Sequence, residues 1–246
     1  MQERTRLFPE IRNFLSKSNL DVVLSGFSIL AALNAISSFL GSSAILYATE
    51  GHWWGAVLVN FVFDSWGTFV GLLGSVLLFL PVLLGSPADQ RKVLSTYFLS
   101  MSITIGVGSS LLWNYLFGSG AISYGSSAID IAAQSIIFTL ASFALVRSFL
   151  GRGSQSDPYI RNSFRVIYAT IVLTTVWFIF YLQPIFVSTN QFNWRVHEIA
   201  FISGILLTGS FLAILKYRTV RKIPVKEPSE LELATRNERT RQAKIP

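Results

Sequence analysis

The sequence predicts an all-α polytopic membrane protein with six transmembrane helices. Of its 246 residues, 51% are hydrophobic and only 13% are charged, a composition typical of multi-pass membrane proteins. The apolar residues form long runs, and a helix of about 20 such residues crosses the hydrocarbon core of a bilayer. The basic residues fall almost entirely in alternate connections between these runs, as topology signals do. We therefore expect a helical bundle with both termini in the cytoplasm.

Six apolar segments account for the crossings, in chain order. The first is uncharged from residue 22 onward, and the second is interrupted only by Asp64. The uncharged run 93–129 is too long for a single crossing, and the Gly-Ser-Gly sequence at 118–120 predicts a turn inside it. The third segment precedes this turn, and the fourth begins after it and continues through the uncharged run 131–146. The fifth and sixth carry basic residues only near their ends. The expected spans are 21–44, 54–84, 93–116, 126–147, 164–186 and 195–217.

The segments outside the expected membrane domain, 20–217, are polar. Residues 1–19 are charged throughout, so we expect a cytoplasmic N-terminal segment and no signal peptide. Residues 218–246 are basic and interrupted by proline, which predicts a disordered cytoplasmic tail. The chain has no cysteine, and disulfide and thiolate chemistry are therefore excluded.

The distribution of charge sets the expected orientation. With six crossings, all 20 Lys and Arg residues except Arg195 lie on one side, which the positive-inside rule assigns to the cytoplasm. A seventh crossing, made by dividing 54–84, would move Arg91 and Lys92 to the side opposite the basic N-terminus. The formal net charge of +7 is therefore attributed to topology and lipid-headgroup contacts. We expect no nucleic-acid partner, since no aromatic-and-basic binding motif is present.

Three polar residues are expected at one depth in the membrane. Asn60, Ser127 and His197 lie near the starts of the second, fourth and sixth spans, which all begin on the outer face. At 1.5 Å per residue, all three fall within roughly 10 Å of the outer boundary. Each has an ordinary structural explanation by itself: a serine bonded to its own helix, an asparagine between helices, an interfacial histidine. Their coincidence in depth favours a functional site.

These residue types fit nucleophilic hydrolysis. A serine hydroxyl becomes a good nucleophile when a neighbouring imidazole takes its proton, so we expect Ser127 and His197 to be catalytic. A helix N-terminus has free backbone N–H groups, which can donate to a developing oxyanion. Gly125 allows a tight turn into that helix. Gly125 and Ser126, together with the Asn60 amide, are the expected oxyanion- and substrate-binding residues.

At these positions the chain resembles the rhomboid family of intramembrane serine proteases, in its six-helix prokaryotic form. The family motif GxSG corresponds to GSSA at 125–128, the motif HxxGFxxG to HEIAFISG at 197–204, and HxxxN to AVLVN at 56–60. The resemblance covers roughly 20–217. It implies Ser127 as nucleophile, His197 as base and Asn60 as oxyanion donor. It also implies transmembrane protein substrates, no cofactor, and a multi-pass location in the plasma membrane.

The chain departs from the family pattern at three places. Ala128 and Ala200 replace motif glycines, and both remain small. Ala56 replaces the histidine of the second helix, which removes one expected oxyanion donor. His52 lies one turn earlier, out of register with that position. We therefore expect weak activity, with a catalytically weak or inactive rhomboid-like adaptor as the alternative.

Other polar residues raise further alternatives. His197 and Glu198 would begin a zinc-binding HExxH motif, but Phe201 occupies the position of its second histidine, so no metal is expected. Asp64 and Asp130 lie inside spans, where a carboxyl group either bonds a neighbouring helix or marks an ion or proton path. A small transporter or binding protein with a polar outer cavity is thus a further alternative, although no internal repeat supports it.

Small residues spaced four apart predict close helix contacts. Such pairs occur at Gly67 and Gly71, at Ala128 and Ala132, and at Ala200 and Gly204. The last two pairs lie beside Ser127 and His197, and a close crossing there would bring the two side chains within reach. The sequence indicates neither the substrate nor the oligomeric state.

Overall fold

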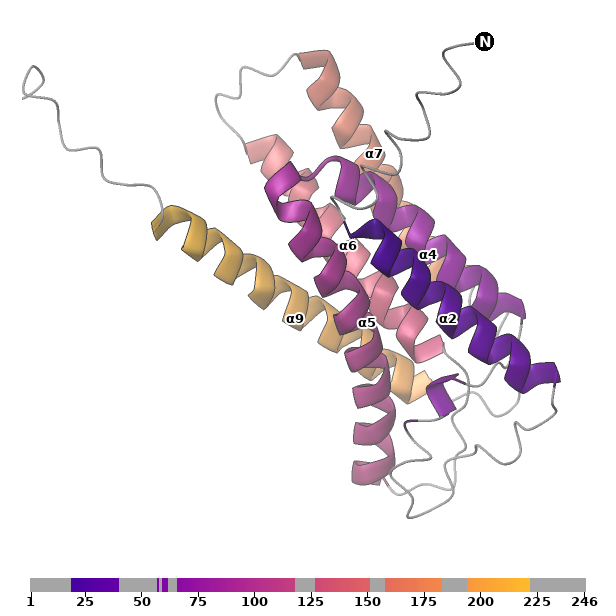
Figure 1. Cartoon of the computed structure of the whole chain (residues 1–246). Helices are drawn as coiled ribbons and strands as arrows, with labels where there is room; N and C mark the ends of the chain where they lie inside the picture. Colours follow the sequence, from indigo (N-terminus) through magenta and orange to yellow (C-terminus); the bar gives the residue numbers. More distant parts are fainter. Residues whose placement is uncertain are drawn as a thin grey trace, which may run out of the picture. The chain divides into compact units, whose positions relative to one another are not determined.

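The computed structural model describes residues 19–39, 57, 59–61, 66–117, 127–150, 158–182 and 194–221, and all the regular structure in these ranges is helical (Figure 1). These described ranges contain six α-helices and two short helical elements of other types. They are α2 (Leu20–Phe39), the 3-10 turn η2 (Val59–Phe61), α4 (Trp66–Leu84), α5 (Ala88–Phe117), α6 (Ser127–Leu150), α7 (Pro158–Trp177), the π-helical turn η3 (Phe178–Leu182) and α9 (Trp194–Arg221).

Four of these helical segments are long and apolar enough to cross a membrane. Two shorter apolar segments, Leu20–Leu33 and Val70–Leu84, lie in α2 and α4. The all-α class and the multi-pass character predicted from the sequence are therefore confirmed for the described residues, while the count of six crossings stays a prediction. The four long segments are Ala88–Trp113, Ser127–Leu150, Arg161–Leu182 and Arg195–Lys216.

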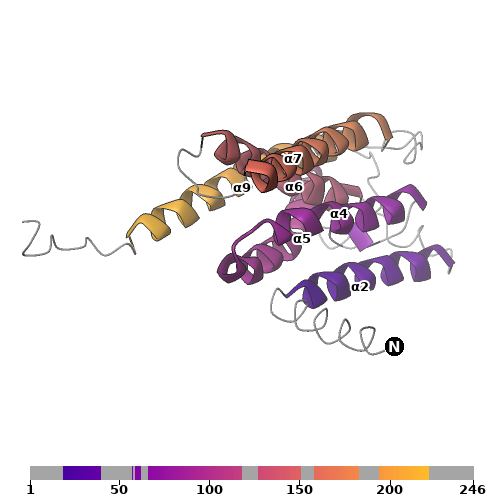
Figure 2. The same ribbon diagram turned by 90° about the horizontal axis from the view of Figure 1, so that it is seen from above.

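Helix α6 is the most enclosed of the four. It contacts α4, α5 and α7, and every residue from Ser127 to Ile137 is buried. A helix that is buried on all sides belongs to the interior of a bundle. The first three turns of α6 are therefore surrounded by other parts of the protein. Figure 2 shows α2 and α7 on opposite sides of α4.

Between Arg195 and Thr208, helix α9 is buried along a single stripe. In its first half the buried residues recur about once per turn, while residues between them, such as Ile202 and Leu206, are more than half exposed. Only 17% of its most apolar window is buried, against 61% for α6. An apolar face left open in a membrane-length helix is suited to contact with lipid. The stripe consists of Val196, His197, Ala200, Gly204 and Thr208.

Two glycines lie at close contacts between helices. A Cβ atom added at Gly106 of α5 would lie 2.7 Å from both the backbone nitrogen and the Cα of Ile129, so α5 touches the backbone of α6 there. A Cβ at Gly204 of α9 would collide with the Ser135 side chain of α6. The predicted close contact between the small-residue faces of the fourth and sixth spans is therefore confirmed.

The Arg91 side chain bonds to backbone carbonyls in and next to the α4–α5 connection. Helix α5 begins at Ala88, five residues before the predicted span, so that Arg91 lies in its first turn. The Arg91 guanidinium donates from Nη2 to the Leu84 carbonyl and from Nε to the Ser86 carbonyl, both at 3.0 Å. Leu84 is the last residue of α4, and the last carbonyls of a helix have no helical partners. A cation there also offsets the negative end of the helix dipole.

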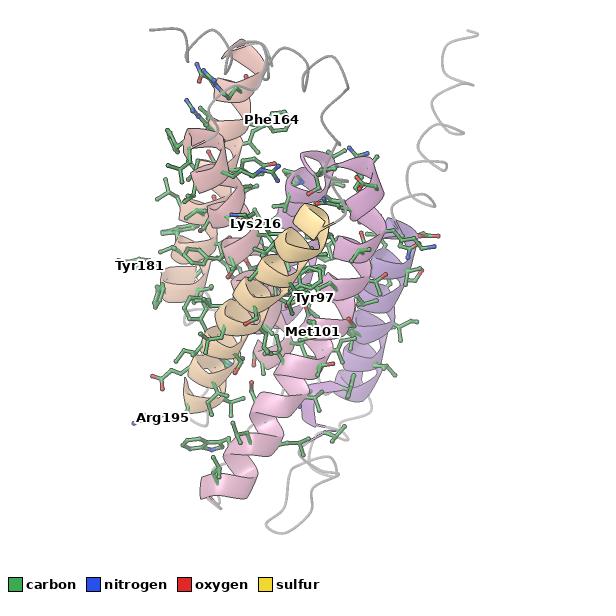
Figure 3. The ribbon with its side chains drawn as sticks, turned by 90° about the vertical axis from the view of Figure 1, so that its left-hand side faces the viewer. Tyr97, Met101, Phe164, Tyr181, Arg195 and Lys216 are labelled. Atoms are coloured by element: carbon green, nitrogen blue, oxygen red, sulfur yellow. The ribbon has the colours of Figure 1, made fainter. Side chains whose placement is uncertain are left out.

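The chain divides into two compact units, Met1–Thr208 and Gly209–Pro246. The described part of the second unit is the C-terminal part of α9, from Gly209 to Arg221. Within the first unit, Figure 3 shows Tyr97 of α5 beside α9, and its hydroxyl donates to Thr208 Oγ1 at 3.3 Å.

Candidate active site

Ser127 is the first residue of α6, and its side chain is buried. The first four backbone N–H groups of an α-helix have no partner within the helix. A nucleophile at this position therefore has hydrogen-bond donors next to it without any further residue. The local sequence favours the burial of Ser127. Ala128 and Ala132 have small side chains, which allow neighbouring helices to approach the first turns of α6.

His197 lies in the first turn of α9 and is also buried. Its Nε2 atom is 2.9 Å from the Oγ atom of Ser127, although the two residues are 70 positions apart in the chain. This distance lies within the range in which an imidazole can take the proton of a hydroxyl. The contact that the sequence predicted between these two side chains is confirmed.

Small residues on α9 bring His197 to the start of α6. Ala200 is fully buried one turn after the histidine, and Gly204 lies against α6 one turn further on. The next residue in the chain, Glu198, faces the other way. Its carboxylate is 3.7 Å from Arg195 Nη1, and both side chains are more than half exposed. Figure 3 shows Arg195 at the beginning of α9, pointing away from the helices.

Asn60 is fully buried in η2, which contacts α2, α5 and α6. Its Oδ1 atom accepts a hydrogen bond of 3.1 Å from the Ser110 hydroxyl of α5. The sequence predicted one continuous helix over 54–84, whereas the structure places Asn60 in a 3-10 turn and begins α4 at Trp66. The Asn60 amide also donates weakly to the Val57 carbonyl at 3.5 Å, and such local side-chain bonds compete with regular helix formation.

Asp130 lies about one turn beyond Ser127 and faces α4. Its Oδ1 atom accepts a hydrogen bond of 2.7 Å from the Ser75 hydroxyl, and Ser75 Oγ in turn accepts one of 2.6 Å from the Gln134 amide. All three side chains are fully buried. A Cβ at Gly71 of α4 would collide with the carboxyl group, so this glycine makes room for it. Of the two roles left open by the sequence, these contacts favour the hydrogen-bonding one.

Several predicted site residues lie outside the described part of the chain. They are Gly125 and Ser126, which precede Ser127, together with His52 just before the second span and Ala56 and Asp64 within it.

Sequence reasoning missed four residues around the site: Gly106 and Ser110 on α5, and Ser75 and Gln134 in the Asp130 cluster. The first two form a small-xxx-small pair of the same kind as those identified on the neighbouring spans, and that signal was available. Gln134 lies one turn after Asp130 on the same helix, which would have marked it as a second polar member.

Within the described ranges, no three His, Cys, Asp or Glu side chains gather as a metal site would require. Comparisons with protein-family models, with curated proteins and with solved structures find no match for this chain. The case for a function therefore rests on the motifs and on the geometry of the site.

Proposed function

We propose that the protein is an intramembrane serine endopeptidase of the rhomboid type, which cleaves transmembrane segments of other proteins with a Ser127–His197 dyad. The observation that supports this most directly is the 2.9 Å contact between His197 Nε2 and Ser127 Oγ, made between the first turns of two helices of membrane-spanning length. The rhomboid-like motifs contain these same two residues at the positions of nucleophile and base.

The dyad would work by acyl transfer. His197 Nε2 takes the hydroxyl proton of Ser127 while Oγ attacks the carbonyl carbon of the scissile peptide bond. The tetrahedral intermediate then collapses as the C–N bond breaks, and the imidazolium gives its proton to the leaving amine. Water next attacks the acyl-enzyme with His197 again acting as base. The second step releases the carboxylate product and restores the serine.

Two kinds of donor are available for the oxyanion in this proposal. The unpartnered N–H groups at the start of α6 come with the position of Ser127. The Asn60 side-chain amide, held in η2 against α6, would supply another. Ala56 removes the donor that the resembled family has one turn earlier, so we propose a slow enzyme.

The proposed substrates are single membrane-spanning segments with helix-weakening residues near the outer boundary, because a peptide bond inside a regular helix is shielded from attack. The proposed topology is six crossings with both termini in the cytoplasm. It places Ser127 and His197 near the outer face of the plasma membrane, where water for the second step can reach them. The lipid bilayer itself is the other partner.

The direct test is cleavage of a model transmembrane substrate by the purified protein in liposomes. The parent should cleave and Ser127→Ala should not, and a fluorophosphonate probe should label the parent only. Ser102→Ala is a matched control, since Ser102 is a buried serine that bonds only to the Phe98 carbonyl of its own helix. Equal cleavage by the parent and Ser127→Ala would reject the proposed enzyme.

A second candidate is a rhomboid-like adaptor that binds transmembrane helices without cleaving them. Ala56 is the observation that favours it. Binding of the model substrate by the parent, with no Ser127-dependent product and no probe labelling, would select the adaptor.

A further inference from the structure

Helix α5 touches two parts of the proposed active site with one face. Gly106 lies against the backbone of Ile129, two residues after the nucleophile. Ser110, one turn further along α5, donates its hydroxyl proton to Asn60 Oδ1 at 3.1 Å, and both side chains are buried. Residues four apart lie on the same side of a helix. The same face of α5 therefore contacts the helix that carries Ser127 and the asparagine proposed to bind the oxyanion.

The Ser110 hydroxyl differs from the hydroxyls of Ser102 and Ser109, two other buried serines of α5. Ser102 and Ser109 bond to carbonyls of their own helix, four residues back, at 2.6 and 2.7 Å. This is what serine ordinarily does in a membrane helix. The corresponding distance from Ser110 to the Gly106 carbonyl is 3.3 Å, longer than its distance to Asn60. The Ser110 Oγ atom thus lies within hydrogen-bond distance of both acceptors and is closer to the asparagine.

This contact matters because the two ends of an asparagine side chain are chemically opposite. The oxygen only accepts and the nitrogen only donates, yet the two ends have nearly the same shape, so a half-turn of the amide exchanges them. An oxyanion is stabilised by the NH₂ end alone. A donor bonded to Oδ1 favours the orientation in which the oxygen faces α5 and the NH₂ group lies on the other end of the amide.

We propose that Ser110 is a positioning residue of the oxyanion site, and that it acts by fixing the orientation of the Asn60 amide. The proposal rests on the proposed peptidase function. Ser110 does not contact substrate in this scheme. Its hydroxyl keeps Asn60 in the donating orientation before the transition state forms, so that no amide rotation is needed during the reaction.

A double-mutant cycle tests the proposal by its kinetics. We expect Ser110→Ala to lower kcat for the model transmembrane substrate about tenfold without changing KM. This is less than the roughly 10²–10³-fold loss found on removing an oxyanion donor elsewhere. In an Asn60→Ala background, Ser110→Ala should have no further effect. Ser109→Ala, the neighbouring buried serine, should leave kcat unchanged. An unchanged kcat in Ser110→Ala, or the same loss with and without Asn60, would overturn the proposal.

A second measurement does not depend on turnover. In protein labelled with ¹⁵N-asparagine, the Asn60 side-chain amide signals are those that disappear in Asn60→Ala. Ser110→Ala should shift these signals and speed their hydrogen exchange, while Ser109→Ala should not. Unchanged Asn60 signals would overturn the proposal by themselves. If the parent cleaves no faster than Ser127→Ala, the proposed peptidase fails, and the spectra still decide whether Ser110 orients Asn60. If Ser110→Ala does not fold, Ser110→Cys takes its place, with changes in the same direction that are smaller because the thiol is still a weak donor.

Discussion

The first two turns of α6 carry two buried polar groupings that differ in their partners. Ser127 meets His197 of α9 in one hydroxyl-to-imidazole contact. Asp130 meets Ser75 of α4, and Gln134 completes a chain of three side chains in which each hydrogen bond leads to the next. We call these the dyad and the clamp. The dyad joins a hydroxyl to an imidazole, which is the proposed base, whereas in the clamp the hydroxyl proton is donated to a carboxyl oxygen.

The comparison shows that a polar residue inside a membrane helix takes its role from the helix opposite to it. Ser127 and Asp130 are one turn apart on α6 and equally enclosed, yet one faces a base on α9 and the other a serine on α4. Depth in the membrane alone would have placed both in one site. Substitutions in the dyad and in the clamp should therefore have different effects.

The largest expected difference is in turnover. His197→Ala should lower the single-turnover cleavage rate by at least about 10⁴-fold, because nothing else in the dyad accepts the serine proton. Asp130→Asn keeps an oxygen that accepts from Ser75, and it should retain most of the activity. Both rates are measured on the model transmembrane substrate in liposomes. Comparable losses in the two variants would show that the clamp takes part in catalysis.

The next effect is on stability. Ser75→Ala should lower the free energy of unfolding by about 1–3 kcal/mol, since it leaves a buried carboxyl oxygen and a buried amide without their partner. Reversible denaturant unfolding in mixed micelles measures this loss. Turnover below the unfolding range should stay close to that of the parent. A stability within about 0.5 kcal/mol of the parent would mean that the clamp contributes little to folding.

Two glycines of α4, Gly71 and Gly74, provide a second test of whether the clamp contributes to stability. Gly71→Ala places a methyl group against the Asp130 carboxyl and should lower the unfolding free energy by about 1 kcal/mol or more. Gly74 is the matched control, because a Cβ there has nothing within 4 Å. Gly74→Ala should be neutral or slightly stabilising, as expected for Gly to Ala in a helix. The same unfolding assay applies, and equal effects of the two substitutions would exclude a specific contact at Gly71.

The substitution expected to perturb the protein least tests on which side of the membrane α6 begins. Asp89 is exposed at the start of α5, and the chain has no cysteine of its own. Asp89→Cys should therefore leave activity and stability unchanged and provide a single labelling site. A membrane-impermeant maleimide should label it only after the cells are permeabilised. Labelling of intact cells would place the dyad near the cytoplasmic face and reverse the proposed topology.

The sequence was most informative where spacing and composition act together. Ser127 and His197 could be paired because both begin apolar runs on the same side and both are followed by small residues that permit close contact. The all-α class followed from hydropathy alone. These features depend on local sequence and on the thickness of the bilayer, which are both known before folding.

The remaining contacts depend on how each helix is rotated about its axis, which long uniform apolar runs do not specify. Ser110 and Ser109 are adjacent serines in such a run, yet only Ser110 faces Asn60. The sequence likewise does not distinguish Ser75 from the other serines, because its bond to Asp130 depends on how α4 packs against α6. The 3-10 turn at Asn60 was missed because apolar periodicity does not distinguish a break in a helix from its continuation.

The narrow buried stripe on α9 has a consequence for how this protein can vary in evolution. Positions that face lipid can exchange one apolar residue for another freely, so most of α9 should drift quickly between relatives. Substitutions should be restricted at Val196, His197, Ala200, Gly204 and Thr208, about one position per turn. In α6, by contrast, eleven consecutive residues from Ser127 to Ile137 are enclosed, and substitutions there must preserve shape at every position. Distant relatives should therefore share a continuous block in α6 and only a sparse, regularly spaced pattern in α9.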